Sequence, residues 1–265
     1  MVDLAAQVLR HNRLLAAMPL NTLALLAPDL RKVSLEQGAV LFEPGELIEN
    51  IYFPLTGLIS LTVIGKDGRF IEASTVGREG AVGLHSGLGR RRSFTRATAQ
   101  IGGNFSTIQA ARFEHIANGS APIWDVILRY TEVLWAETQQ IAACNALHSA
   151  SARLCRWLLL SSTATKSPLT QELLAQMLGA RRTTVTLLAQ RMQAKGLIRY
   201  RRGRIVILDR KALEACMRML PGDASRKDIG IAITPPNSNR AIQVPMSARL
   251  AAVQSFTPSA CGSFS

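Results

Sequence analysis

The sequence predicts an α+β fold with an antiparallel β domain, then one long helix, then a C-terminal winged helix-turn-helix. Short β-prone runs with glycine-containing turns fill residues 31–108. Apolar residues recur at alternating spacings of four and three from residue 123 to 148. Residues 169–208 fit two helices that meet at a glycine, followed by a hairpin. The predicted domains are residues 1–122, 123–148 and 149–220, with a tail of residues 221–265.

The N-terminal part begins with short helices over residues 4–30, and the β-prone runs follow. The clearest strands are Val40–Phe42, Ile51–Phe53, Leu58–Ile64, Phe70–Val76 and Ala97–Ile101. Strands at this spacing are typical of an antiparallel sandwich or jelly roll. A helical turn is expected over residues 109–118, where Gly119 and Pro122 then interrupt the chain.

The long helix carries a heptad pattern over more than three heptads. Its members are Ile123, Ile127, Tyr130, Leu134, Glu137, Ile141, Cys144 and His148. Such a pattern predicts a homodimer, with Ile127, Tyr130, Leu134, Glu137 and Ile141 at the interface. The alternative is a helix buried against its own β domain, with Trp124, Leu128 and Trp135 packing there from the adjacent face; both interpretations can hold.

The C-terminal domain has the local signals of a helix-turn-helix. Thr170 is a good N-cap for the first helix, and Gly179 supplies the bend. The second helix is expected from about Arg181 to Lys195, where Gly196 ends it. Two β-prone runs around a basic tip, Arg201-Arg202-Gly203-Arg204, predict a hairpin wing, and a last helix is expected over residues 209–220.

The residues at the start of the second helix suit a DNA duplex. A helix fits the major groove, where arginine bonds guanine and threonine bonds a base or touches a thymine methyl. The basic wing would meet phosphates. The predicted DNA-binding residues are Thr170, Gln171, Arg181, Arg182, Thr183, Thr184, Thr186, Arg201, Arg202 and Arg204. The alternative is a helical packing unit with a solvated basic face.

The distribution of charge supports nucleic-acid binding by one domain only. Residues 1–148 hold 13 Lys and Arg against 13 Asp and Glu, whereas residues 149–220 hold 14 against 3. Nearly all of the net charge of +13 therefore lies in the predicted winged domain. This asymmetry indicates a polyanionic partner, double-stranded DNA.

The segments LTQELLAQMLGARRTTVT and GLIRYRRGRIVILDR resemble the C-terminal domain of the Crp/Fnr family of bacterial transcription regulators. The resemblance covers roughly Leu15 to Leu220 and is most specific in its last third. It implies a β-roll sensor of the cyclic-nucleotide-binding type, a dimer helix, a cytoplasmic DNA-binding regulator, and RNA polymerase as a further partner. By position, Arg182 matches the first arginine of the family's recognition helix. Thr183 and Leu187 replace a glutamate and a second arginine, which implies a different half-site.

The resemblance also points to an effector segment. It places the family's phosphate-binding residues at Glu79, Gly80, Gly83, Arg92 and Ser93, and backbone N–H groups with an arginine suit a phosphate. However, Ala81-Val82-Gly83 stands where a ribose-binding glutamate is expected. We therefore expect another small effector, or none, in preference to a cyclic nucleotide, which stays an open alternative, and we predict no cofactor.

Composition argues against several other classes. No apolar run reaches the ~18 residues that a membrane span needs, and Asp3 and Arg10 interrupt any secretory pattern. The four cysteines lack metal-binding spacing, and the four histidines are isolated. No metal site and no enzymatic activity are predicted. Two alternatives stay open: a ligand-binding signalling module with only non-specific DNA affinity, and a metal-dependent enzyme in the β domain.

Overall fold

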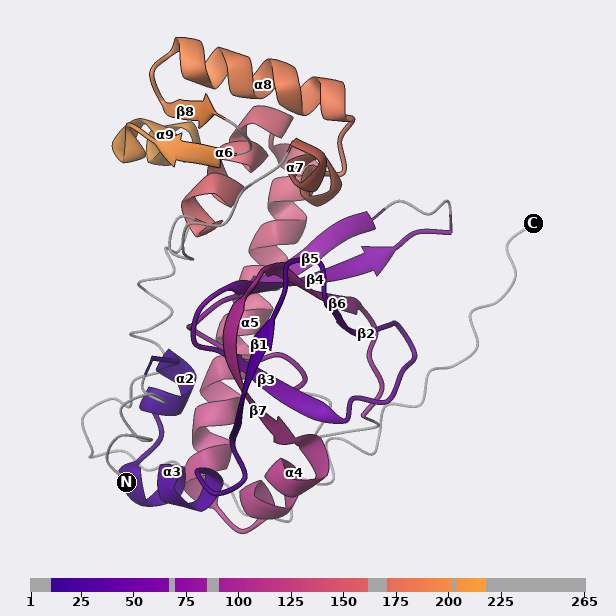
Figure 1. Ribbon diagram of the computed structural model, residues 1–265, viewed down its shortest axis with the longest axis vertical. Coiled ribbons are helices and arrows are strands. Elements are labelled where there is room, and N and C mark those ends of the chain that lie inside the picture. Colours follow the sequence, from indigo (N-terminus) through magenta and orange to yellow (C-terminus); the bar gives the residue numbers. More distant parts are fainter. Residues whose placement is uncertain (1–10, 67–69, 85–90, 162–170, 202–203, 218–265) are drawn as a thin grey trace. The chain divides into compact units, whose positions relative to one another are not determined.

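A computed structural model describes residues 11–66, 70–84, 91–161, 171–201 and 204–217 (Figure 1). All of these residues belong to one compact unit, which lies within residues 1–234. The predicted α+β fold is confirmed, with an N-terminal antiparallel β domain, a long helix and a helical C-terminal region that carries a hairpin. The tail predicted to be disordered lies outside the described residues.

In the described residues from 11 onward, the short helices α2 (Arg13–Ala16) and α3 (Leu20–Leu26) precede the β domain, as expected. Asn12 caps α2, because its side-chain oxygen accepts a hydrogen bond from the Leu15 amide at 3.0 Å. The side chain of Asn12 is fully buried, and its amide nitrogen donates to the carbonyls of Pro54 at 3.0 Å and Gly80 at 2.8 Å. One asparagine therefore ties α2 to two segments of the β domain.

Within the described part of the β domain, seven strands form two antiparallel sheets (Figure 1). They are β1 (Arg31–Leu35), β2 (Val40–Phe42), β3 (Asn50–Pro54), β4 (Leu58–Ile64), β5 (Phe70–Val76), β6 (Arg96–Ile101) and β7 (Gly103–Gln109). One sheet has the order β1-β7-β3 and the other β2-β6-β4-β5. All five predicted strands are present, whereas β1 and β7 were not among the runs that stood out in the sequence.

The core of the β domain draws on both sheets. Phe42, Ile59, Val76 and Ala97 from one sheet pack with Phe105 of the other, and all are buried. The turn before β4 needs a glycine, because Gly57 has φ +82° and a Cβ there would lie 2.6 Å from the Ile101 carbonyl oxygen. The close approach of the turn to β6 thus depends on that glycine.

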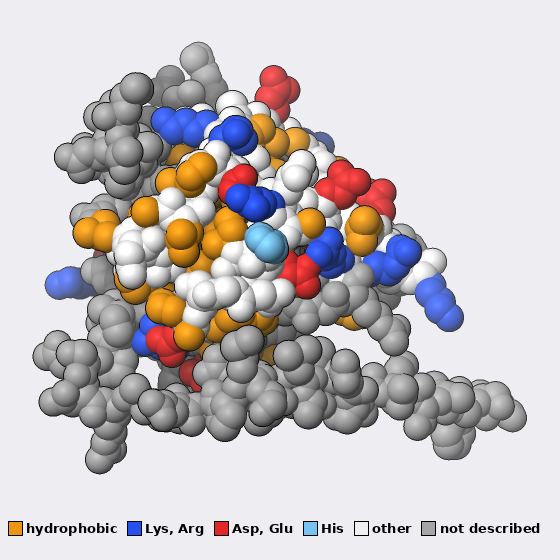
Figure 2. Space-filling view, turned by 90° about the horizontal axis from the view of Figure 1, so that it is seen from below, with side chains coloured by type: hydrophobic (Ala, Val, Ile, Leu, Met, Phe, Trp, Pro, Cys, Tyr) orange, Lys and Arg blue, Asp and Glu red, His pale blue; other side chains and the backbone are white. Residues whose placement is uncertain are grey.

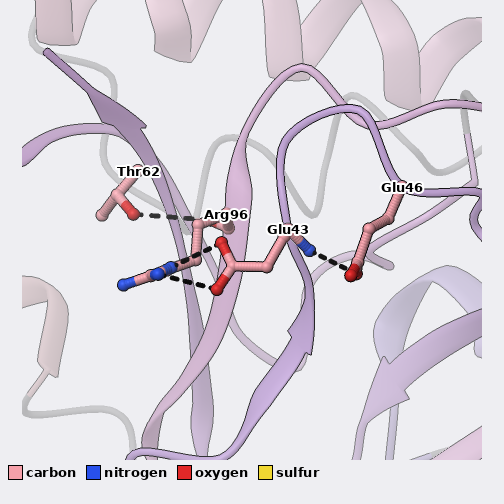
Figure 3. A network of polar contacts seen from close by, with 4 residues as sticks. All are labelled: Glu43, Glu46, Thr62 and Arg96. Atoms are coloured by element: carbon pink, nitrogen blue, oxygen red, sulfur yellow. Dashed lines mark hydrogen bonds and ion pairs between the residues drawn. The ribbon is translucent and has the colours of Figure 1, made fainter. Parts of the chain in front are cut away.

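A surface network of polar contacts joins the strands of the second sheet (Figure 3). Arg96 binds the Glu43 carboxylate through two nitrogens, at 2.8 and 2.7 Å, and its guanidinium lies 5.2 Å from the centroid of the Phe70 ring. The hydrogen bond with Glu43 raises the pKa of Arg96. Glu46 accepts from the Glu43 amide at 2.8 Å, and Thr62 donates to the Arg96 carbonyl at 3.5 Å. The ends of β2, β5 and β6 are fastened together by these contacts.

Helix α4 (Ala110–Asn118) leads into the long helix α5 (Ala121–Leu147), close to the limits predicted for both. The buried residues of α5 include Ile123, Val126, Ile127 and Tyr130, and they share a core with α2, α3 and α4. One side of the N-terminal half of α5 is therefore covered by its own chain.

This burial corrects the predicted dimer interface. Ile127 is 0% and Tyr130 2% exposed in the single chain, so neither side chain is available to a partner. Leu134, Glu137 and Ile141 are half-buried. Conversely, Leu128 and Trp135, expected to pack on the β domain, are 46% and 65% exposed. The prediction is therefore wrong for Ile127 and Tyr130, and the face expected to pack on the β domain is exposed at Leu128 and Trp135.

The surface around α3 and α4 carries mixed charge. In the view from below, hydrophobic side chains lie among both basic and acidic ones (Figure 2). Leu20 and Leu25 of α3 are 63% and 54% exposed. The mixture agrees with the equal numbers of basic and acidic residues in residues 1–148. None of the described helices is both long enough and apolar enough to span a bilayer.

Candidate nucleic-acid interface

The helix-turn-helix consists of α7 (Gln171–Leu178) and α8 (Arg182–Ala194). Gly179, with φ +57°, ends α7 in the left-handed conformation, and the Ala180 amide donates to the Ala175 carbonyl at 3.0 Å. Arg181 is the N-cap residue of α8. The predicted bend at the glycine is confirmed.

The end of α8 and the wing also follow the sequence signals. Gly196 has φ +71°, and the Leu197 amide donates back to the Met192 carbonyl at 3.0 Å, which closes the helix. The hairpin pairs β8 (Ile198–Arg201) with β9 (Arg204–Ile207). Helix α9 (Arg210–Met217) follows, with Asp209 accepting from the Ala212 amide at 2.9 Å.

A hydrophobic core holds these elements against helix α6 (Ala150–Ser161). Its buried members include Leu154, Leu174, Val185, Met192, Ile198 and Leu213. Burial raises the pKa of the Cys155 thiol on α6, and a hydrogen bond with Cys216 of α9 raises it further. Because one side of α8 packs in this core, the opposite side faces outward, and the core determines which residues lie on it.

The outer side of α8 presents most of the side chains predicted to bind DNA. Arg181, Arg182 and Thr183 are exposed, and Thr184 is half-buried. The first turn of α8 contains no acidic residue, and the N-cap side chain makes no capping hydrogen bond. The start of the helix therefore combines two guanidinium groups with the positive end of the helix dipole, an arrangement that attracts an anion.

The hydroxyl of Thr186 is hydrogen-bonded within the domain. Its hydroxyl donates to the Gln171 side-chain oxygen at 2.9 Å and to the Arg182 carbonyl at 3.0 Å. Both Thr186 and Gln171 are half-buried. This pair joins the start of α7 to α8 and positions the two helices, and contact of Thr186 and Gln171 with DNA stays a prediction.

The rest of the predicted interface is only partly within the described residues. Thr170 and Arg202 lie outside them. Arg201 and Arg204 end β8 and begin β9 and pair with each other in the hairpin register, which places both at the tip of the wing. Their position agrees with a phosphate-contacting wing, which stays a prediction.

The backbone of the predicted effector segment is hydrogen-bonded to other groups of the protein. The Ala81 amide donates to the Tyr130 hydroxyl at 3.1 Å, and that hydroxyl donates to the Ala81 carbonyl at 3.0 Å. The Gly80 amide donates to the Gly77 carbonyl at 3.2 Å, and the Val82 amide to the Tyr52 carbonyl at 2.9 Å. Three successive N–H groups that would face a phosphate therefore have partners within the chain.

The remaining effector candidates also serve the fold. Glu79 is buried, and its carboxylate accepts from the Gly77 amide at 2.6 Å. Gly83 has φ +87°, and a Cβ there would lie 2.8 Å from the Asn50 carbonyl oxygen. These two residues thus shape the turn that holds the segment against β3.

Arg92 and Ser93 bind a different loop. Arg92 donates to the Gly45 carbonyl at 2.7 Å, and the Ser93 hydroxyl donates to the Thr95 carbonyl at 2.5 Å. The backbone of Ser93 also pairs with Gly45 and Glu46. Both residues therefore also make contacts within the chain, and Ala81 stands where a ribose-binding carboxylate is expected.

Sequence reasoning missed two residues of this segment. The heptad pattern places Tyr130 in the predicted dimer interface. No sequence signal points to Asn12, whose side chain donates to the Gly80 carbonyl. Neither had a signal in the sequence, because a tyrosine in an apolar stripe and an asparagine before a helix both have ordinary local explanations. Only the tertiary structure brings them to residues 80 and 81.

Comparison with known proteins agrees with both halves of this architecture. Residues 32–119 match the family described as the cyclic nucleotide-binding domain, and residues 152–216 match the Crp-like helix-turn-helix domain. No curated protein sequence matches the chain significantly.

Among solved structures, several share the fold at low sequence identity. FixK2 from Bradyrhizobium japonicum has a TM-score of 0.58 at 17% identity, over 72% of this chain and 99% of that one. A CRP/FNR-family transcriptional regulator from Thermus thermophilus has a TM-score of 0.58 at 22% identity, over 71% and 98%. The global regulator CLP of Xanthomonas campestris, described as responsive to c-di-GMP, has a TM-score of 0.57 at 16% identity, over 72% and 100%.

The two family matches lie on either side of α5, and the solved structures share the whole arrangement. The chain therefore combines a domain of the cyclic nucleotide-binding type with a Crp-like DNA-binding helix-turn-helix domain, which is the architecture of a Crp/Fnr-type transcription regulator.

Proposed function

We propose that this protein is a homodimeric, sequence-specific DNA-binding transcription regulator that responds to an effector through its β-roll. The observation that carries this proposal is the exposed row of Arg181, Arg182 and Thr183 at the start of α8. The opposite side of the same helix is anchored through Val185 and Met192, which are 0% and 3% exposed. The row is thus held in a fixed orientation.

The position of this row on the helix suits direct readout of bases. The N-terminal residues of a recognition helix contact base edges, while phosphate contacts orient the domain. Arg182 supplies a bidentate donor for guanine, and Thr183 supplies a hydroxyl and a methyl. The Gln171–Thr186 hydrogen bond holds α7 and α8 together, so the row keeps its orientation when the helix enters the groove.

The exposed face of α5 supports a dimer. Leu128 and Trp135 are one heptad apart on this face, and Ala142 is one heptad further. Thr131 and Thr138 lie between them, and their hydroxyls donate to the Ile127 and Leu134 carbonyls at 2.8 Å, so their polar groups are satisfied within the helix. The face is therefore suited to a parallel helix pair.

A dimer would present two recognition helices to the same side of a duplex. With the helices about one turn of DNA apart, ~34 Å, the preferred site would be an inverted repeat. Each half-site alone would bind weakly, and the linked pair would bind far more tightly.

We further propose that the effector is not a cyclic nucleotide bound at residues 79–83. The paired N–H groups and Ala81 support this. An effector signal has a direct route to the DNA-binding domain, because β5 contacts both α5 and α7. A ligand would change DNA affinity only if it bound one arrangement of these elements more tightly than another.

The test is selection of bound duplexes from a random pool with the full chain, followed by affinity measurements on preferred and random duplexes. Arg182→Ala should weaken the preferred duplex by about 1–3 kcal/mol and relax the base preference. Arg210→Ala is the matched control, because it removes the same charge from α9, where Arg210 pairs with Glu214.

Equal losses on both duplexes for Arg182→Ala would contradict base readout by that residue. A pool without any enriched sequence would contradict the proposal as a whole. That outcome would favour a signalling module with only non-specific DNA affinity, whose binding falls steeply with salt but carries no sequence preference.

A further inference from the structure

One large apolar side chain lies exposed on the outer side of α8. Leu187 is 55% exposed, whereas Val185 and Met192 are buried and Leu188 is packed against the domain core. A single exposed leucine on a protein surface is common and needs no explanation by itself. Its surroundings on the helix are what make Leu187 informative.

Leu187 lies in the middle of the face that would enter the groove. Residues three and four apart on a helix share a face, so Leu187 is flanked by Thr183 on one side and by Gln190 and Arg191 on the other. All three neighbours are exposed. The other residue at this level, Thr186, is bonded to Gln171. The face is therefore polar except for one branched apolar group at its centre.

In the major groove, the C5 methyl of thymine is the apolar feature that tells a T·A pair from the others. The Leu187 side chain cannot donate or accept a hydrogen bond, so it would desolvate the exposed amino or carbonyl groups of other base pairs without compensation. Resting on the Crp/Fnr-type function proposed above, we propose that Leu187 reads the methyl group of a thymine in each half-site.

The place of this thymine relative to other bases follows from helix geometry. Leu187 is five residues after Arg182, about 7.5 Å along the helix axis. Because base pairs are stacked about 3.4 Å apart, the thymine should lie within about two or three base pairs of the guanine that Arg182 contacts. The half-site would thus pair a guanine contact with a methyl contact.

The experiment removes the methyl group without changing hydrogen bonding. Each thymine of one half-site in a selected duplex is replaced in turn by deoxyuridine, and the full-length protein is titrated. One replacement should weaken binding about fourfold, the effect of burying one methyl group. In Leu187→Ala, the same replacement should have a markedly smaller effect.

Leu25→Ala is the matched control, because Leu25 on α3 is 54% exposed and has no part in the interface; its deoxyuridine effect should equal that of the unchanged protein. Leu187→Arg gives a second measurement, since repeated selection should enrich guanine in place of the thymine. Equal thermal unfolding temperatures of the variants would show that exposed Leu187 is not needed for folding.

The outcomes separate this inference from the proposed function. If no duplex is enriched, the proposed function fails and this inference fails with it. If duplexes are enriched but no deoxyuridine replacement matters, methyl recognition is refuted while sequence-specific binding stands. A penalty that persists unchanged in Leu187→Ala would assign the methyl contact to another side chain and overturn the role of Leu187.

Discussion

The hydroxyl of Tyr130 on α5 holds both backbone groups of Ala81: it accepts from the amide at 3.1 Å and donates to the carbonyl at 3.0 Å. Tyr130 is 2% exposed, so the pair is shielded from water. The side chain of Tyr130 on the long helix thus hydrogen-bonds the backbone of the segment in which the family resemblance places the effector site. The stability of the protein and its expected lack of response to cyclic nucleotides should both depend on this contact.

Tyr130→Phe should destabilise the protein by about 1–3 kcal/mol, because it leaves a buried amide and a buried carbonyl without partners. The free energy of unfolding from urea denaturation measures the loss. Tyr52→Phe is the control: the pKa of half-buried Tyr52 is raised by burial and by Glu49, but removing its hydroxyl should cost less than about 0.5 kcal/mol. Equal losses in the two variants would contradict the role given to the Tyr130–Ala81 contact.

Gly80→Ala tests how closely Tyr130 packs against the backbone of residue 80. A Cβ at Gly80 would lie 2.2 Å from the Tyr130 hydroxyl, a distance that forces the ring or the backbone to move. Such overpacking typically costs about 1–3 kcal/mol. Gly119→Ala serves for comparison, because its Cβ would lie 3.7 Å from the nearest atom, the Ile116 carbonyl oxygen. Calorimetry that shows no lower unfolding temperature for Gly80→Ala would argue against the close packing.

Trp135→Ala should weaken the proposed dimer at least tenfold, since central aromatic residues contribute about 2 kcal/mol or more to such interfaces. Sedimentation equilibrium of the full chain measures the dissociation constant. Leu20→Ala, on exposed α3, should leave it unchanged. A protein that stays monomeric at high concentration and on DNA would rule out the dimer.

Cyclic AMP and cyclic GMP should leave the thermal unfolding temperature unchanged at millimolar concentration. A ligand at a hundred times its Kd would add about 2.7 kcal/mol to the free energy of unfolding, which is a rise of several degrees. Ala81→Glu should not restore binding, because Tyr130 still occupies the Ala81 amide. A clear upward shift with either nucleotide would show that the segment opens to admit a phosphate.

Local sequence signals were sufficient to predict the helix ends and the orientation of α8 in the C-terminal domain. Gly179 and Gly196 mark the ends of α7 and α8 because both have positive φ, a conformation in which glycine has no steric cost. The apolar residues of α8 and the basic start of the helix then fix which side faces inward. These features depend on neighbours in the chain, so a single sequence reveals them.

In the β domain and the long helix, local signals did not predict the start of β7 or the buried face of α5. Strand β7 begins at Gly103, the second residue of a glycine pair, and such a pair is a local signal for a turn and not for a strand. On α5, Ile127 and Leu128 belong to adjacent apolar stripes with the same spacing, so periodicity cannot decide which stripe the β domain covers. The contacts of Tyr130 and Asn12 with residues 80 and 81 are long-range and had no counterpart in the sequence.

Five residues separate Tyr130 from Trp135, so their side chains point about 140° apart around α5. In the dimer proposed above, a rotation of α5 that separated Tyr130 from Ala81 would also move the face that carries Trp135. Pairing of subunits through that face would then oppose the release of Ala81, and substitutions on either side of α5 would be constrained by both contacts.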